Sequence, residues 1–162
     1  GSLEVLSGKG VIKVDSDLIT NALAEIRCPA RIEVISENPL IIVDTAHTVA
    51  SMKILRESIN ENFSYRKLVL VLGLSSDKDI EGVLKEITCI SDDLILTRTG
   101  NPREAEPEQM AAIVKRFFHK NLMVIEDIDE ALDEAKRIAK NDDLICITGS
   151  FFLAGMVKDV HD

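Results

Sequence analysis

The chain has 162 residues, enough for one domain with a sizeable core, and 46% of them are hydrophobic and 29% charged, as is typical of globular proteins. Its formal net charge of −9 at pH 7 argues against a nucleic-acid partner, because phosphate binding needs a dense patch of Lys and Arg. No apolar run approaches the ~20 residues that a membrane span needs, so no membrane partner is expected.

The N-terminal segment is interpreted as separate from the domain that follows it. Gly1-Ser2 resembles the scar left by tag removal, and the absence of a basic segment there predicts no signal peptide. Val11–Val14 predicts a brief strand, and a helical pattern follows that ends before Pro29. The apolar positions of this helix are Ile19, Ala22, Leu23 and Ile26. We therefore expect the tail of a preceding domain in residues 1–28 and one domain in residues 29–162.

Five short apolar runs predict the strands of a buried sheet. They are Leu40–Val43, Leu68–Leu72, Leu94–Leu96, Leu122–Ile125 and Leu144–Ile147. Most are nearly continuous Ile, Val and Leu, which is typical of strands covered on both faces. Their starts lie 22 to 28 residues apart, a spacing that suits βαβ units and therefore parallel strands.

The segments between these runs have the apolar spacing of helices. A helix is expected over Thr48–Asn62 with Thr48 as its N-cap. The other three are marked by Ile80, Val83, Leu84 and Ile87, by Met110, Ile113, Val114 and Phe117, and by Ile128, Ala131, Leu132, Ala135, Ile138 and Ala139.

One more apolar run, Arg31–Ile35, precedes the first parallel strand. Only residues 36–39 separate it from Leu40, which is short enough for a hairpin, so this strand should be antiparallel to its neighbour. The sequence thus predicts an α/β fold with a doubly wound, mostly parallel six-stranded sheet that includes one antiparallel strand.

The cysteines favour a cytoplasmic protein. Cys28, Cys89 and Cys146 are an odd number, lie far apart and form no CxxC pair. Neither a zinc site nor a disulfide framework is therefore indicated, and three reduced thiols are expected.

Candidate ligand-binding residues lie just after the strands, because ligands of open α/β sheets bind beyond the carboxyl ends. Asp44 is either an acceptor for a sugar hydroxyl or a metal-bound water, or a cap for the next helix. His47, close behind it, is either structural or catalytic. Ser75–Asp79 is interpreted as a helix N-terminus, in which Lys78 could reach an anion. Gly149-Ser150 is either an anion-binding helix start or a tight turn with a Ser cap.

Several common motifs are absent from the sequence. It contains no GxxxxGK(S/T) loop, no GxGxxG, no HExxH and no GxSxG. A phospho-receiver domain would need a Lys after the last strand, where this chain has Thr148-Gly149-Ser150.

Four segments carry a resemblance to a known family. Cys28–Ile35, Leu40–His47, Ser76–Asp79 and Leu144–Ser150 occur in the order of the family's Pro-Gly-Arg, Asp-Gly-Ala-His-Asn, Asp-Lys-Asp and Thr-Gly-Ser motifs. From Ile19 to Val160 the chain resembles the C-terminal domain of folylpolyglutamate synthase/dihydrofolate synthase, the folate branch of the Mur ligase superfamily. It departs from that pattern in having Cys28 for an aromatic residue, Ala30 and Thr45 for Gly, and Thr48-Val49 for Asn-Pro.

The resemblance implies an ATP-dependent ligase that joins glutamate to a folate or dihydropteroate carboxylate through an acyl phosphate. It implies that Arg31 and Asp44 bind ATP, Asp44 through a ribose hydroxyl, and that His47 and Ser150 lie near the glutamate or the transferred phosphate. ATP and Mg²⁺ would be bound mainly by an N-terminal ATPase domain, with no metal ligand in this domain. Without that ATPase domain, the chain alone is predicted to be inactive.

Two alternatives stay open. One is a Mur-type ligase domain for another acceptor, such as a peptidoglycan peptide. The other is a stand-alone α/β binding module without a catalytic role.

Overall fold

The strands of the sheet follow the apolar runs of the sequence closely. The computed structural model describes residues 30–161, with side chains given up to residue 157. The strands are β1 (Glu33–Glu37), β2 (Leu40–Val43), β3 (Leu68–Leu72), β4 (Asp93–Leu96), β5 (Asn121–Val124) and β6 (Leu144–Thr148). The strand and helix expected before Pro29 and the domain boundary at residue 28 lie outside the described residues.

The six strands form one sheet in the order β1-β2-β6-β3-β4-β5. β1 is antiparallel to β2, and all other neighbours are parallel. The predicted fold class is therefore confirmed, including its single antiparallel strand.

β1 begins later than the sequence suggested. It was expected over Arg31–Ile35 but spans Glu33–Glu37, because Ala30 and Ile32 have left-handed φ values of 54° and 49° that no strand accommodates. The hairpin connection is correspondingly shorter than residues 36–39, since Glu37 already pairs with Leu40.

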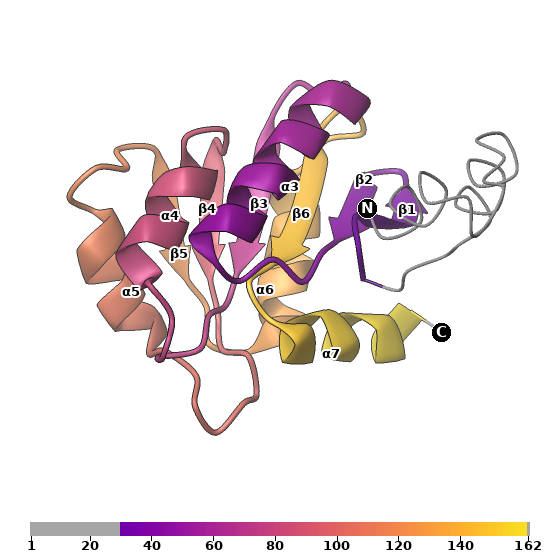
Figure 1. Cartoon of the computed structure of the whole chain (residues 1–162). Helices are drawn as coiled ribbons and strands as arrows, with labels where there is room; N and C mark the ends of the chain where they lie inside the picture. The colour runs from indigo at the N-terminus through magenta and orange to yellow at the C-terminus, as the bar shows by residue number, and fades with distance from the viewer. Residues whose placement is uncertain (1–29, 162) are drawn as a thin grey trace, which may run out of the picture.

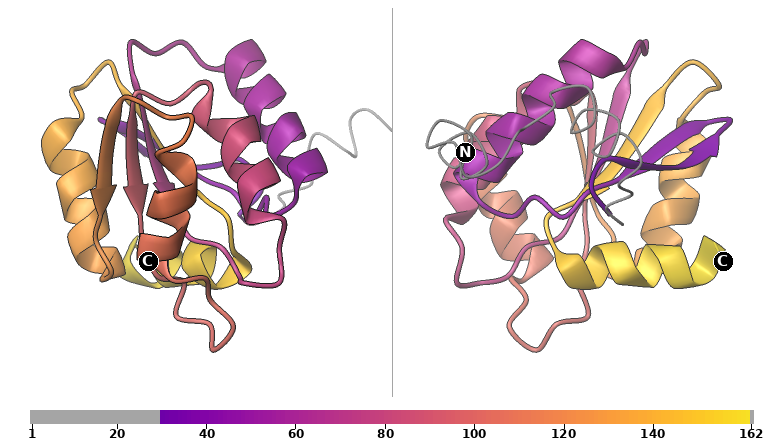
Figure 2. Two further views of the ribbon diagram at one scale, coloured as in Figure 1. Left: turned by 90° about the vertical axis from the view of Figure 1, so that its left-hand side faces the viewer. Right: turned by 45° about the vertical axis from the view of Figure 1, so that its right-hand side comes forward.

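The helices lie in two layers, one on each face of the sheet (Figure 2). On one face lie α3 (Val49–Asn62), α4 (Ile80–Thr88) and α5 (Pro107–Val114). On the other lies α6 (Ile128–Ile138), and α7 (Phe151–His161) contributes to the same core as α6 from the carboxyl ends of the strands. The expected helix around Met110–Phe117 is shifted toward the N-terminus. Pro107 suits its first position, and the residues after Val114 tighten into i→i−3 turns that leave Phe117 outside the helix.

The continuous apolar strands are buried on both faces, as their composition predicted. In β3, Leu68, Leu70 and Leu72 face the core under α3, α4 and α5, whereas Val69 and Val71 face the core under α6 and α7. This alternation gives the sheet two separate hydrophobic cores.

The strand order opens a crevice beside β6. The chain leaves β2 and β3 toward helices on one face, but it leaves β6, which lies between them, toward α7 on the other face. Figure 1 shows α7 running across the sheet at the carboxyl ends of the strands. Such a switch point is where open α/β sheets bind their ligands.

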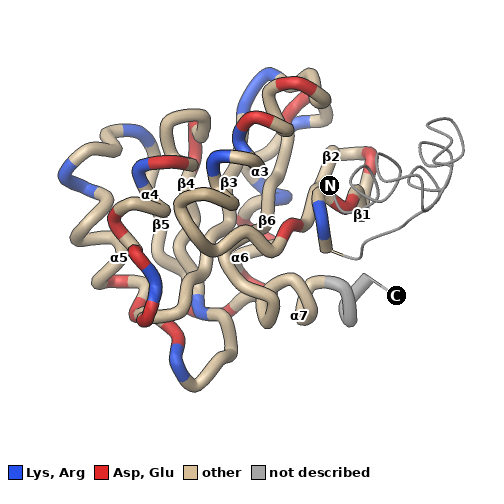
Figure 3. The backbone as a smooth tube through the Cα atoms, in the orientation of Figure 1, with Lys and Arg blue, Asp and Glu red and all other residues tan. Residues whose placement is uncertain are grey.

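Charged residues of both signs lie side by side over the helices and loops in the view of Figure 3, without a face of one sign. Within residues 30–161, no helix combines the length and the apolar character required to cross a bilayer.

Candidate functional site

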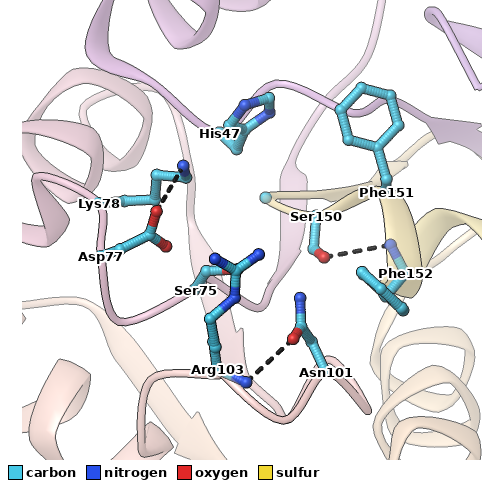
Figure 4. A pocket seen from close by; sticks show the side chains of 10 residues that line it. His47, Ser75, Asp77, Lys78, Asn101, Arg103, Ser150, Phe151 and Phe152 are labelled. Carbon is cyan, nitrogen blue, oxygen red and sulfur yellow. Dashed lines mark hydrogen bonds and ion pairs between the residues drawn. The ribbon is translucent and has the colours of Figure 1, made fainter.

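Two cavities lie at the carboxyl ends of the strands. The first, the polar pocket, has a volume of about 160 Å³, and the loops after β2, β3, β4 and β6 all contribute to it (Figure 4). It is lined by His47, Ser75, Asp77, Lys78, Asn101, Arg103, Gly149, Ser150, Phe151 and Phe152. The second, the Asp44 pocket, has a volume of about 190 Å³. It is lined by Arg31, Ile32, Asp44, Ala46, Ser51, Ile54 and Leu55.

Two cations face the polar pocket. Lys78 Nζ donates to Asp77 Oδ2 at 2.9 Å, which leaves two of its three hydrogens for a ligand. This bond, together with the nearby charge of Arg103, holds the pKa of the Asp77 carboxyl below its ordinary value. The Arg103 side chain extends toward the middle of the pocket (Figure 4). Among residues 30–157, whose side chains the structure describes, none forms an ion pair or a side-chain hydrogen bond with its guanidinium.

The backbone of Arg103 is fixed although its side chain has no such partner. Its N–H donates to Asn101 Oδ1 at 2.9 Å, and its carbonyl accepts from the backbone N–H of Ser76 at 2.8 Å. The hydroxyl of Ser76 donates to the same carbonyl at 3.0 Å. A guanidinium on a fixed backbone at a cavity is suited to bind a carboxylate or a phosphate.

The N-terminus of α7 closes the pocket on the β6 side. Gly149 has a φ of 107°, and a Cβ there would run into the carbonyl oxygen of Gly73, so only glycine fits this turn. Ser150, 5% exposed, accepts a hydrogen bond from the N–H of Phe152 at 3.2 Å. Its hydroxyl hydrogen remains available to a ligand, and the helix dipole adds partial positive charge.

His47 lies opposite this helix. Its Nδ1 is 2.8 Å from the carbonyl oxygen of Thr45, and since a carbonyl only accepts, Nδ1 carries the hydrogen in that bond. Nε2 is therefore the ring nitrogen left for a ligand. The ring packs against Phe151, with the two centroids 5.4 Å apart.

Asp44 uses both carboxylate oxygens within the fold. Oδ1 accepts from the N–H of Ala46 at 2.6 Å, and Oδ2 accepts from the N–H of Ile32 at 3.0 Å. The residue is only 4% exposed. It therefore ties the segment before β1 to the end of β2. The alternative that Asp44 caps the next helix is wrong, because Thr48 is the N-cap of α3 and Asp44 accepts no N–H of that helix.

The backbone around Arg31 is strained, which fixes where its exposed side chain begins. The residues on either side, Ala30 and Ile32, both have left-handed φ, a conformation that costs about 1–2 kcal/mol for a residue with a Cβ. Their N–H groups donate to the carboxylates of Glu33 and Asp44 at 2.6 and 3.0 Å, which offsets part of that cost.

The predicted site residues thus fall into two neighbouring pockets. Arg31 and Asp44 line one, and His47 and Ser150 line the other. Thr48 is the N-cap of α3, as predicted, and its hydroxyl is bonded to Ser51 rather than open to a phosphate.

Sequence reasoning missed Asn101 and Arg103. They lie in a loop with no apolar periodicity, and the available signal was its position directly after a strand of the sheet. Thr45 has no left-handed φ, so the family's Gly is not needed there for a backbone reason. Its buried hydroxyl oxygen has no hydrogen-bond partner among the described residues.

The described residues offer no ready metal centre. Within residues 30–161, no group of three or more His, Cys, Asp or Glu side chains could hold a metal ion together. The chemistry of both pockets is that of hydrogen bonds and charge.

Comparison with known proteins matches the chain to a family. The family described as "Mur ligase, glutamate ligase domain" matches residues 30–151. A dihydrofolate synthase/folylpolyglutamate synthase of Mycobacterium tuberculosis is 29% identical over 97% of this chain and 35% of that protein. A UDP-N-acetylmuramoyl-L-alanyl-D-glutamate–2,6-diaminopimelate ligase of Aquifex aeolicus is 32% identical over 84% of this chain and 29% of that protein.

The fold agrees with a solved structure of this group. Mycobacterium tuberculosis folylpolyglutamate synthase complexed with ADP matches with a TM-score of 0.85 and 26% identity, covering 92% of this chain and 36% of that chain. The chain therefore spans about a third of the length of the curated relatives that it matches.

Proposed function

The chain belongs to the family of Mur ligase glutamate ligase domains, and on that premise we propose that it is the C-terminal domain of a folylpolyglutamate synthase/dihydrofolate synthase. The whole protein would add glutamate to a folate or dihydropteroate carboxylate, which ATP first converts to an acyl phosphate. An N-terminal ATPase domain of the same protein would be the partner of this chain, and it would hold Mg²⁺ and most of the nucleotide.

The polar pocket carries this proposal, because its groups match an amino acid with two carboxylates. Lys78 and Arg103 supply two positive charges from different loops, and the α7 N-terminus with the Ser150 hydroxyl adds hydrogen-bond donors. Asp77 and His47 Nε2 are the acceptors available for the amino group.

Amide formation needs little more from the protein than placement. The neutral amine of glutamate attacks the carbonyl carbon of the acyl phosphate, and the bond from that carbon to the phosphate oxygen breaks with release of inorganic phosphate. The nitrogen loses one proton, which passes to the departing phosphate or to solvent. Holding both carboxylates fixes the direction of attack, and closing the site keeps water from the acyl phosphate. His47, whose ring is held by Thr45 and Phe151, would accept a hydrogen bond from the amine.

The Asp44 pocket would receive part of the nucleotide. Arg31 is exposed there and would pair with a phosphate, and Asp44 would accept from a ribose hydroxyl. A carboxylate has about four acceptor positions, so the two backbone bonds of Asp44 leave capacity for this contact.

The proposal is tested by turnover of ATP, glutamate and a folate. The full-length protein should form ADP and a lengthened folate only when all three substrates are present, and the 162-residue chain alone should form neither. Turnover by the isolated chain, or none by the full-length protein with any acceptor, contradicts the assignment; the latter result favours a stand-alone binding module.

A second candidate is a ligase for a peptidoglycan precursor. The 32% identity to a diaminopimelate ligase favours it, and diaminopimelate also carries two carboxylates, together with a second amine that Asp77 could bind. An amino-acid and acceptor panel on the full-length protein separates the two: glutamate with a folate indicates the first, and diaminopimelate with a peptide acceptor the second.

A further inference from the structure

Arg98, outside the polar pocket, is held by three carboxylates. Its guanidinium bonds Glu104 Oε1 at 2.8 Å, Glu106 Oε2 at 2.7 Å and Glu126 Oε2 at 3.1 Å. The hydrogen bonds that Arg98 donates to these acids, that to Glu106 first, raise the pKa of Arg98 above its ordinary value. Single surface ion pairs contribute little, but a network with several bonds holds a definite geometry.

Glu104 joins this network to the backbone of the pocket loop, residues 99–103. Its second oxygen, Oε2, accepts the N–H groups of Thr99 and Gly100, both at 2.9 Å, and its side chain is only 17% exposed. Burial alone would raise the pKa of Glu104, but the bonds from Arg98, Thr99 and Gly100 outweigh it and hold that pKa below the ordinary value.

Further contacts fix the pocket loop on its other sides. Glu104 itself forms an antiparallel bridge with Ser75, and the N–H of Ala105 donates to the carbonyl of Leu74 at 2.8 Å. Gly100 has a φ of 71° and lies against α7, where a Cβ would come within 3.0 Å of Met156 Sδ. The loop is thus held by Arg98, by the loop after β3 and by α7.

This arrangement positions the side chain of Arg103. Its guanidinium has no hydrogen-bond or ion-pair partner among the side chains described, residues 30–157, so its place in the polar pocket depends on the backbone that carries it. Of the three acids on Arg98, only Glu104 also bonds the backbone of the pocket loop through its side chain. Among the side chains that the structure describes, the carboxylate of Glu106 bonds only Arg98.

We propose that Glu104, clamped by Arg98, is a positioning residue that sets the backbone of residues 99–103 so that Arg103 meets a carboxylate of the incoming amino acid. Glu104 then controls affinity for the amino acid without touching it. This inference rests on the proposed function, since it needs an amino acid in the polar pocket.

The test compares Glu104→Gln with Glu106→Gln in the full-length ligase. Gln keeps the size of the side chain but loses the charge that holds Arg98 and two backbone N–H groups, so KM for glutamate should rise about tenfold. KM for ATP and kcat should stay within about twofold, and Glu106→Gln should change all three by less than about twofold. An equal rise in KM for glutamate in both variants overturns the proposal.

A double-mutant cycle with Arg103→Ala separates positioning from a general structural effect. If Glu104 acts through Arg103, adding Glu104→Gln to Arg103→Ala should not raise the KM for glutamate further. If the KM for glutamate in the double variant exceeds that of Arg103→Ala by the full effect of Glu104→Gln, the proposal is overturned. An unchanged KM in Arg103→Ala alone overturns the assignment of the pocket itself, and the inference with it.

A measurement on the 162-residue chain does not depend on activity. In ¹⁵N spectra, Glu104→Ala should shift the amides of Thr99 and Gly100 and speed their hydrogen exchange, while the amides of α6 stay unchanged. Unchanged exchange at both amides in a folded variant overturns the proposal, even if the enzymatic variants prove too unstable to assay.

Discussion

The Asp44 pocket and the polar pocket share one edge of the sheet, but they use their charged groups differently. In the first, the carboxylate of Asp44 is buried and bonded to the backbone, and the residues beside Arg31 are strained. In the second, Arg103 and Lys78 project from fixed loops with hydrogens to spare. A group that also holds the fold should be costly to remove for stability, whereas a free group should be costly only for binding.

Asp44→Ala should have the largest effect on stability. It leaves one buried and one partly buried N–H group without an acceptor and should lower the free energy of unfolding by about 3 kcal/mol in urea denaturation. The matched control is Asp127→Ala, which also loses two backbone bonds but at an exposed helix cap and should cost about 1 kcal/mol. Equal losses in the free energy of unfolding would mean that the burial of Asp44 does not increase the cost of removing its carboxylate.

The pocket loop should give the chain a measurable sensitivity to acid. The pKa of Glu104 lies below its unfolded value, so its stabilising contribution is present above about pH 4.5 and is lost as the pH falls through the folded value. Glu104→Gln should therefore be less stable than wild type at pH 7, and the difference in stability should become smaller toward pH 3. Thermal melts at both pH values measure this difference. A difference in stability that does not change with pH would show that the charge of Glu104 does not stabilise the fold.

Ala30→Gly should have a small effect of the opposite sign. Glycine relieves the left-handed strain at φ 54°, although it makes the unfolded chain more flexible, so a net gain of about 0.5 kcal/mol is expected. Ala112→Gly, on the exposed side of α5, should instead lose about 0.5–1 kcal/mol. Destabilisation by both substitutions would show that Ala30 is not strained in solution.

The sequence predicted regular elements well and irregular backbone poorly. β2 and β3 match their apolar runs residue for residue, because strands buried on both faces must be apolar throughout. β1 was placed two residues early, since no local pattern announces a left-handed Ala30 or Ile32. The left-handed Ile32 is held by a bond to Asp44, twelve residues away, and Ala30 by a bond to Glu33, and neither bond follows from the apolar pattern.

The candidate site shows the same division. Asp44, His47 and Ser150 follow strands directly, and the rule that ligands bind at carboxyl ends finds them. Arg103 lies seven residues beyond β4. Its place in the pocket depends on the bond that Ser76 donates to its carbonyl and on the bond that Glu104 accepts from Thr99, and sequence spacing encodes neither. The division of these residues between two pockets also needed the strand order, in which β6 separates β2 from β3.

The most direct test of the proposed two pockets with separate ligands is a crossed measurement of KM in the full-length protein. Arg31→Ala should raise KM for ATP about tenfold and leave KM for glutamate within about twofold, and Arg103→Ala should do the reverse. If both substitutions raise the same KM, or if neither changes either value, the assignment of nucleotide and amino acid to different pockets is wrong.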